Sequence, residues 1–348
     1  MTTAPPLRRV ELTAFGAPEN LRVRRGDPVP DLPPGHARVR VLASSLTLSD
    51  SIVRRGLNPY TSQLDHPFTR GYDLVGRVTE VAGAGLAVGD LVVDLPRWGA
   101  NADEVARPVG ALTRVDVDID PLLLEPLVMT GVTAAQALRH AGPLRGTTVL
   151  VHGATGGVGL LLAELAARGG ARVLGTGSPA KHGALRERGA EPLDGRAGDL
   201  VERVRALAPD GVDAVFDGVG GPSRSIVADT LRAGRAVFVG LGFAGPASTA
   251  ATAPPGHTAA VLAEGRAVLD RLSAEGRTAI EYEVGGAREQ DRAAYDADVA
   301  TLARLVVAGE LHPAVRAVAL EDVAQGHRDV DAGTVTGRLV LDHGRVAA

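Results

Sequence analysis

Apolar and polar residues alternate along most of the first 120 residues of the chain. The segments HARVRVLASSL, DLVGRVTEV and GDLVVDL alternate or run apolar between Gly, Pro and Asp. A period of two places successive side chains on opposite faces of a strand, and short turns between such runs are typical of antiparallel sheets. The pattern therefore predicts a small antiparallel β-domain.

The period changes near Glu125. The segment PLVMTGVTAAQALRHAG has helical spacing and ends at Gly142 and Pro143, which stop a helix. Strand-like and helical segments then follow one another, as in TTVLVHG, LLLAELAARGG, ARVLGTG and PAKHGALRERG. Strands that alternate with helices favour a parallel sheet covered on both faces. The predicted fold class is α/β, with a doubly wound parallel sheet beside the β-domain, and the late segment GRLVLD is expected to return to that β-domain.

Composition adds limits to this picture. A chain of 348 residues is long enough for two domains. Its net charge of −4 offers no broad basic field, so we expect no nucleic acid partner. The absence of cysteine excludes disulfides, thiolate zinc sites, iron–sulfur clusters and a cysteine nucleophile. The N-terminus lacks the apolar core of a signal peptide and no window reads as a membrane helix, so we expect a cytoplasmic protein with no membrane partner.

The segment VLVHGATGGVG follows a predicted strand and precedes a predicted helix, where a dinucleotide-binding loop belongs. Ala154-x-Gly156-x-x-Gly159 matches the spacing of that loop. In such a loop the first small residue makes the tight turn, Gly156 admits the pyrophosphate, and Gly159 allows close packing. The alternative is a steric turn without a ligand. The predicted pyrophosphate site comprises Ala154, Thr155, Gly156, Gly157, Val158 and Gly159.

The next strand ends without an acidic residue. An NAD site has Asp or Glu about 20 residues after the loop, to bind the ribose 2′-hydroxyl, but this chain has GTGS at 175–178. Ser178 and Pro179 favour a helix start, which places Lys181, the sole lysine, in the first turn. An anion such as a 2′-phosphate suits this position, so we predict NADPH rather than NADH. The alternative for Lys181 is a solvated helix residue.

Ten segments in order resemble the medium-chain dehydrogenase/reductase superfamily, in its zinc-independent quinone oxidoreductase (zeta-crystallin-like) branch. They include PFTRGYDLVGRVTEV, MTGVTAAQAL, HGATGGVG, VFDGVGG, ELHPAV and TGRLVL. The resemblance implies a GroES-like β-barrel catalytic domain over 1–125 and 287–348, and a Rossmann NADPH-binding domain over 126–286. It also implies a homodimer. By position it assigns to the cofactor Thr133, Ala154 to Gly159, Ser178, Lys181, Gly220, Gly240 and Leu241.

Some positions depart from the family. Thr47 stands where the quinone oxidoreductases usually have Asn near the nicotinamide. The tyrosine often found near the 2′-phosphate has no counterpart, because Leu193 and Asp194 stand in that segment. The related zinc enzymes have Gly-His-Glu where this chain has Gly-Tyr-Asp at 71–73, so we expect no metal. The alternative is a makeshift zinc site built from Asp50, His66 and Asp73.

Without a Lewis acid, reducing an isolated ketone is harder than conjugate reduction. We therefore expect hydride transfer from NADPH to a small-molecule quinone, enone or enoyl group, in natural-product metabolism or detoxification. Hydrogen-bond donors would meet the developing oxyanion, and the candidate catalytic donors are Tyr60, Thr47 and Thr133. Tyr60 has the alternative role of packing substrate. Two other functions stay open: an NADPH-binding protein with little catalysis, and an enzyme of a redox-neutral step.

Overall fold

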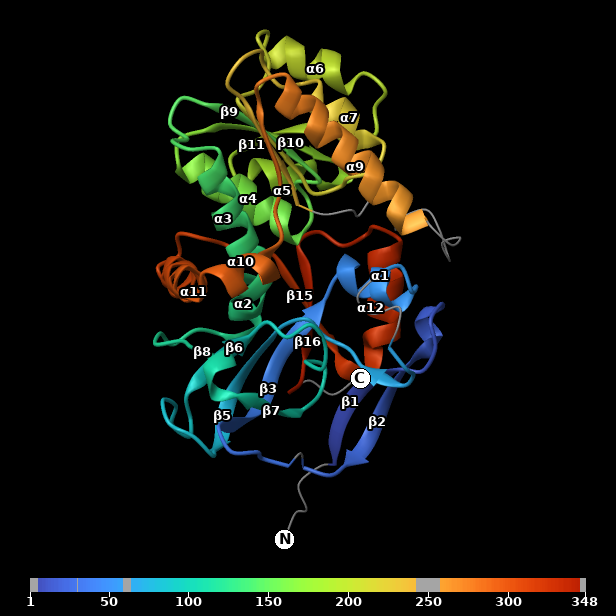
Figure 1. The fold of residues 1–348 in the computed structure, drawn as a ribbon, viewed down its shortest axis with the longest axis vertical. Coiled ribbons are helices and arrows are strands. Elements are labelled where there is room, and N and C mark those ends of the chain that lie inside the picture. The colour runs from blue at the N-terminus through green and yellow to red at the C-terminus, as the bar shows by residue number, and fades with distance from the viewer. Residues whose placement is uncertain (1–5, 30, 59–63, 242–256, 345–348) are drawn as a thin grey trace. The chain divides into compact units, whose positions relative to one another are not determined.

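The computed structural model describes residues 6–29, 31–58, 64–241 and 257–344. The chain divides into two compact units. The first comprises Met1–Met129, Asp296–Glu310 and Val315–Ala348, and the second comprises Thr130–Tyr295 and Leu311–Ala314. Each unit is built around strands and helices of its own (Figure 1).

The first unit is mainly antiparallel β-structure. Its larger sheet has the order β15-β16-β3-β5-β6-β8, with β7 also paired to β3, and its smaller sheet has the order β2-β1-β4. The strands are β1 (Leu7–Leu12), β2 (Leu21–Asp27), β3 (His36–Leu46), β4 (Phe68–Thr69), β5 (Leu74–Val81), β6 (Leu91–Asp94), β7 (Glu104–Pro108), β8 (Thr113–Arg114), β15 (Val315–Ala319) and β16 (Arg338–Asp342). The helices are α1 (Leu48–Arg54), α2 (Pro121–Pro126) and α12 (Val323–Asp331).

Strand β3 lies in the middle of the larger sheet and has one apolar face. Ala37, Val39 and Val41 are buried, while the polar residues between them are at least partly exposed. One face of the strand thus packs on an apolar core, as expected for an antiparallel sheet. Near the other end of the chain, β16 pairs antiparallel with β3. The prediction that GRLVLD returns to the β-domain is confirmed.

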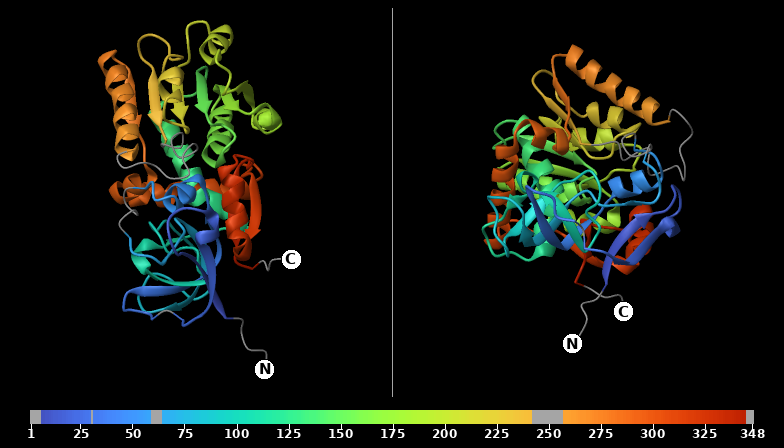
Figure 2. Two further views of the ribbon diagram at one scale, coloured as in Figure 1. Left: turned by 90° about the vertical axis from the view of Figure 1, so that its right-hand side faces the viewer. Right: turned by 60° about the horizontal axis from the view of Figure 1, so that its bottom comes forward.

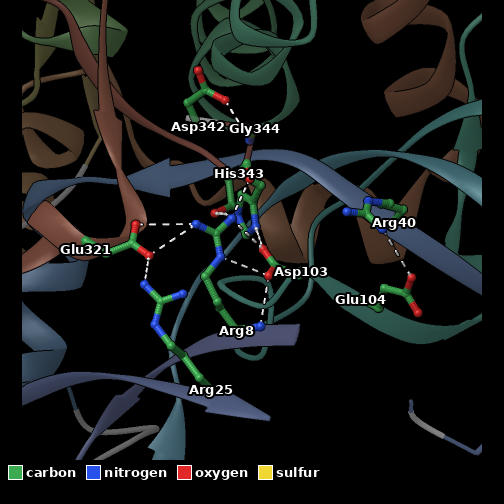
Figure 3. A network of polar contacts seen from close by, with 10 residues as sticks. Arg8, Arg25, Arg40, Asp103, Glu104, Glu321, Asp342, His343 and Gly344 are labelled. Carbon is green, nitrogen blue, oxygen red and sulfur yellow. Dashed lines mark hydrogen bonds and ion pairs between the residues drawn. The ribbon is translucent and has the colours of Figure 1, made fainter. Parts of the chain in front are cut away.

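A polar network lies beside the small sheet of the first unit (Figure 3). Arg8 on β1 pairs with Asp103 at 3.0 Å and with Glu321 at 3.2 Å, and its guanidinium also donates to the backbone carbonyl of His343. Burial opposes the ionisation of Asp103, but hydrogen bonds from His343 and Arg8 outweigh it and lower the pKa of Asp103 to about 2. The network joins β1, the residue before β7 and the C-terminal segment by charge-assisted hydrogen bonds.

The second unit contains a parallel sheet with the order β11-β10-β9-β12-β13-β14. This is the doubly wound order 3-2-1-4-5-6 of a Rossmann fold, so the predicted fold class is confirmed. The strands are β9 (Thr148–His152), β10 (Arg172–Gly177), β11 (Ala190–Asp194), β12 (Ala214–Asp217), β13 (Val237–Gly240) and β14 (Thr278–Glu281). The helices are α3 (Val132–His140), α4 (Gly157–Arg168), α5 (His182–Arg186), α6 (Leu200–Leu207), α7 (Ser223–Ala228), α9 (His257–Ala274) and α10 (Val284–Gln290), while α11 (Arg292–Val307) runs on into the first unit.

Helices cover both faces of this sheet. On one face, an apolar cluster unites Leu150 and Leu174 of the strands with Val204 of α6, Val227 of α7 and Leu272 of α9. Helix α4 contacts β9, β10 and β11 and also packs against α3 and α5, as expected for helices on the opposite face of a doubly wound sheet. Figure 2 shows α9 beside the strands of this sheet, which agrees with its contacts to β14 and α7. Strand β9 is apolar and buried along most of its length because it is covered on both sides.

The helical run Pro121–His140 is long and apolar enough to cross a membrane by length and composition. Our expectation that no window reads as a membrane helix is wrong by that criterion. However, 67% of the apolar window is buried inside the structure. A helix that is apolar all round is also what a buried core position requires.

Candidate functional site

The glycine-rich loop lies between β9 and α4, at the carboxyl edge of the parallel sheet. Its positive φ of 79° falls at Gly153, and no described residue other than glycine has a positive φ. Ala154 is fully buried, and its N–H donates to the carbonyl of Thr176 at 2.9 Å. The tight turn is therefore made by Gly153, and the prediction that Ala154 makes it is wrong. The reason is that a left-handed backbone favours glycine, whereas Ala154 packs its methyl group inward.

Gly156 and Gly159 have different reasons to be glycine. A Cβ at Gly159 would overlap the carbonyl oxygen of Gly153 and would lie 2.6 Å from Cα of Ala154, so the loop and the helix could not pack as they do. A Cβ at Gly156 would meet only the carbonyl oxygen of Gly153, at 3.6 Å, an ordinary contact. Gly156 is also exposed. The protein itself does not require glycine at this position, but a closely approaching ligand would.

The N-terminus of α4 faces this loop. Gly156 is its N-cap residue and has no side chain to accept from the first N–H groups, and the helix continues for 12 residues. Uncapped N–H groups and the helix dipole favour an anion at this end. The residues Gly157, Val158 and Gly159 form the first turn, as the sequence predicts. Thr155 precedes them, and its methyl group occupies the space that a side chain on Gly177 would need.

Lys181 follows the next strand of the sheet. It ends a 3₁₀ turn, Pro179–Lys181, and its N–H donates to the carbonyl of Ser178 at 2.9 Å. Ser178 is the N-cap residue of this turn and Pro179 its first residue, so the predicted place of Lys181 in the first helical turn is confirmed. The turn is 3₁₀, Ser178 makes no side-chain cap, and α5 begins only at His182. Burial, and then the positive charge of Arg196, lower the pKa of Lys181.

Arg196 is a candidate that the sequence analysis missed. Strands β10 and β11 are parallel neighbours in which Gly177 pairs with Asp194. The Asp194 carboxylate accepts the N–H of Arg196 at 3.0 Å and so holds the chain just after β11. Two cations, Lys181 and Arg196, thus follow the ends of adjacent strands. The sequence signal that could have identified it is its position. Arg196 stands two residues after Asp194, next to the segment in which the family's tyrosine has no counterpart.

The other predicted cofactor positions follow β12 and β13. The N–H of Gly220, where φ is 71°, donates to the Asp217 carboxylate at 3.0 Å, and the N–H of Leu241 donates to the carbonyl of Asp217 at 2.8 Å. Gly240 ends β13, where a Cβ would lie 2.9 Å from the Arg224 guanidinium. The second unit thus brings these residues and the glycine loop to one edge of its sheet, where Rossmann proteins bind ligands. Thr133 is buried on α3.

In the first unit, Thr47 caps α1. Its hydroxyl donates to the Asp50 carboxylate at 2.9 Å, and its backbone N–H donates to the same oxygen at 2.9 Å. Asp50 is buried and also pairs with Arg70 at 2.9 Å. Burial raises the pKa of Asp50, although Arg70 opposes the shift. For Thr47 to donate to a substrate, its bond to Asp50 would have to break. Tyr60, the other predicted donor of this unit, lies outside the described residues.

The two carboxylates of the alternative zinc site, Asp50 and Asp73, are both paired with arginines. Asp50 pairs with Arg70, and Asp73 pairs with Arg338 at 2.5 Å. His66 packs between the rings of Phe15 and Phe68, with centroids 4.4 and 5.3 Å away. Among the described residues, no three His, Cys, Asp or Glu side chains are grouped so as to hold a metal ion.

Two known protein families match parts of the chain. Residues 33–107 match the alcohol dehydrogenase GroES-like domain family, and residues 189–341 match the zinc-binding dehydrogenase family. The synaptic vesicle membrane protein VAT-1 homolog of Rattus norvegicus is 35% identical over 225 residues, which cover 63% of this chain and 55% of that protein. The chain spans about half the length of the curated relatives that it matches.

Two solved structures share the fold along nearly the whole chain. The quinone oxidoreductase from Coxiella burnetii is 25% identical with a TM-score of 0.80, and the match covers 97% of this chain and 99% of that one. Mycobacterial Rv1454c, complexed with NADPH, is 26% identical with a TM-score of 0.80, and the match covers 96% and 99%.

A GroES-like β-unit joined to a Rossmann-type unit defines a dehydrogenase/reductase of the medium-chain class. The chain belongs to the medium-chain dehydrogenase/reductase superfamily, in its quinone oxidoreductase (zeta-crystallin-like) branch. The resemblance inferred from the sequence motifs is confirmed.

Proposed function

We propose that this protein is an NADPH-dependent oxidoreductase that reduces a conjugated carbonyl, such as a quinone, enone or enoyl group. The observation that carries the proposal is Gly156, which is exposed at the cap of α4 and whose lack of a side chain leaves the backbone open to a closely approaching ligand. The mycobacterial relative, whose structure is a complex with NADPH, supports the choice of cofactor, and the quinone oxidoreductase from Coxiella burnetii supports the class of reaction.

The residues of the second unit would hold NADPH by its two phosphate groups, the central pyrophosphate and the 2′-phosphate of the adenosine ribose. The N–H groups at the start of α4 suit the pyrophosphate, and Lys181 and Arg196 suit the 2′-phosphate. When bound, NADPH supplies a hydride from its nicotinamide ring. Hydride addition at the β-carbon of an enone would place negative charge on the carbonyl oxygen, and a proton delivered to the α-carbon by solvent or a donor would complete the reduction. Hydrogen bonds to that oxygen from Tyr60, Thr47 or Thr133 would stabilise the charge.

NADPH absorbance tests this proposal directly. We expect the protein to oxidise NADPH in the presence of at least one small quinone or enone, because the proposed chemistry needs no metal. Tight NADPH binding without oxidation by any acceptor of the panel would contradict the reductase. That outcome would favour an NADPH-binding protein with little catalysis, which is the second candidate because the Thr47 hydroxyl is already bonded to Asp50.

The choice between NADPH and NADH has its own test. Lys181→Ala should weaken NADPH binding by about 10- to 100-fold, the value of one charge-assisted hydrogen bond, and leave NADH binding nearly unchanged. Arg196→Ala should act in the same direction with a smaller effect because Arg196 is exposed. Titration of both cofactors measures the change, and Arg186→Ala, an exposed arginine of α5, is the control. Equal losses for the two cofactors would contradict a 2′-phosphate site.

A further inference from the structure

His152 is the last residue of β9 and stands immediately before the glycine-rich loop. It is buried, with 4% of its surface exposed. Both ring nitrogens have a partner: Nδ1 lies 2.8 Å from Oγ1 of Thr176, and Nε2 lies 3.1 Å from Oγ of Ser223. The fold of the second unit thus holds this buried histidine between hydroxyl groups from two different chain segments. The proposed function assigns no role to it.

The directions of these bonds follow from counting protons. The Ser223 hydroxyl donates its one proton to the carbonyl of Gly220 at 2.9 Å, so it accepts from Nε2–H of His152. Nδ1 is then an acceptor, and the Thr176 hydroxyl donates to it. The same hydroxyl oxygen accepts the N–H of Gly153 at 2.9 Å. Burial, opposed by the charge of Asp217, lowers the pKa of His152, which agrees with a neutral ring.

The result is a continuous chain of hydrogen bonds from Gly153 to Gly220. Each of these two glycines lies in a turn with positive φ, after β9 and after β12 respectively. The two strands are parallel neighbours in which His152 pairs with Asp217. Both turns are therefore at the edge where the cofactor would bind. Gly153 and Gly220 have no side chains of their own to fix their peptide groups, so the orientation of these groups depends on hydrogen bonds such as those of Thr176 and Ser223.

We propose that His152 is a positioning residue, which through Thr176 and Ser223 holds the loop at Gly153 and the turn at Gly220 in the arrangement that binds the cofactor. The proposal rests on the proposed NADPH site. It requires no contact between His152 and the cofactor. His152 orients the Thr176 hydroxyl, which accepts the N–H of Gly153. It also orients the Ser223 hydroxyl, which donates to the carbonyl of Gly220.

Variants at position 152 test this role by NADPH titration. His152→Phe keeps a ring of similar shape but loses both bonds, and should weaken NADPH binding about tenfold. His152→Asn keeps an acceptor near the place of Nδ1 and should restore affinity to within about threefold of the wild type. The melting temperature without cofactor is measured in parallel. A purely structural histidine would lower the melting temperature of the Phe variant and leave its NADPH affinity within about twofold of the wild type, and that result would overturn the proposal.

A second pair of variants keeps the proposal testable if His152→Phe does not fold. Thr176→Val removes the bond to Gly153 directly, and Ser223→Ala removes the link to Gly220. The bonds form one chain. The double variant His152→Asn and Ser223→Ala should therefore bind NADPH no less tightly than whichever of the two single variants binds it less tightly. Losses that multiply would overturn the chain. A wild-type protein that binds no NADPH would instead overturn the proposed function, whereas normal binding by every variant would overturn the role of His152 alone.

Discussion

Gly156→Ala is expected to reduce NADPH binding by on the order of a hundredfold, because it places a methyl group where the pyrophosphate must approach the backbone. The fold should tolerate the change. Gly156 has φ of −82° and ψ of 175°, which alanine adopts without strain, and its nearest new contact is an oxygen at 3.6 Å. The free energy of unfolding should therefore change by no more than about 1 kcal/mol. Calorimetric titration with NADPH and denaturant unfolding together measure the two effects.

Gly159→Ala is the matched control for this prediction. Its methyl group would lie 2.6 and 2.8 Å from the Cα and carbonyl carbon of Ala154, which are backbone atoms that cannot turn aside. We expect it to destabilise the protein by about 1–3 kcal/mol, and to lose NADPH binding together with stability. If Gly156→Ala bound NADPH as tightly as the wild type, the loop would be a steric turn and the proposed cofactor site would be wrong.

Arg338→Met is expected to give a large loss of stability, about 3–5 kcal/mol. Arg338 is buried in the first unit between two fully buried carboxylates, with bonds of 2.5 Å to Asp73 and 2.7 Å to Glu125. Removing the guanidinium leaves both carboxyl groups in an apolar interior without their cation. Denaturant unfolding measures the loss. Arg266→Met, which breaks an exposed pair with Asp270 on α9, should change stability by no more than about 0.5 kcal/mol.

The loss of folding stability in the Arg338→Met variant should grow as the pH rises. Burial raises the pKa of Glu125 well above its usual value, and Arg338 opposes this shift. A carboxyl group with a raised pKa in the folded state contributes stability that is fully present below its unfolded pKa and is lost as pH rises through its folded pKa. Without Arg338 the folded pKa rises further, so the variant should be least unstable in acid and most unstable in alkali. A loss that is the same at every pH would contradict this account of Glu125.

The sequence predicted the large features of the fold well. The change from period two to alternating strands and helices predicted both units, and the apolar run before HGATGGVG predicted a central strand of a parallel sheet. These patterns are local, because the apolar residues that form the buried face of a strand or helix lie close together in the chain. The cofactor loop was predictable for the same reason, since its glycines are neighbours along the chain.

The errors and omissions have a common cause. Ala154 was assigned the tight turn because motif spacing says nothing of φ, which the structure places at Gly153. Arg196 was missed because its proximity to Lys181 depends on the pairing of β10 with β11. The alternative of a zinc site rested on Asp50 and Asp73 as oxygen donors. The sequence does not show that Arg70 and Arg338 pair with these two carboxylates. NADPH, the homodimer and the catalytic roles of Tyr60, Thr47 and Thr133 stay predictions.

The sequence by itself thus determined the two-part α/β fold, the family and the place of the glycine loop. The tertiary structure alone decided which polar groups are satisfied by one another. Arg338 meets Asp73 across 265 positions of the chain, and His152 meets Ser223 across 71. The physical reason is that a buried charge or hydroxyl must find a partner wherever the fold places one. Periodicity records which side chains are buried, but only the packed strands and helices bring the partners together.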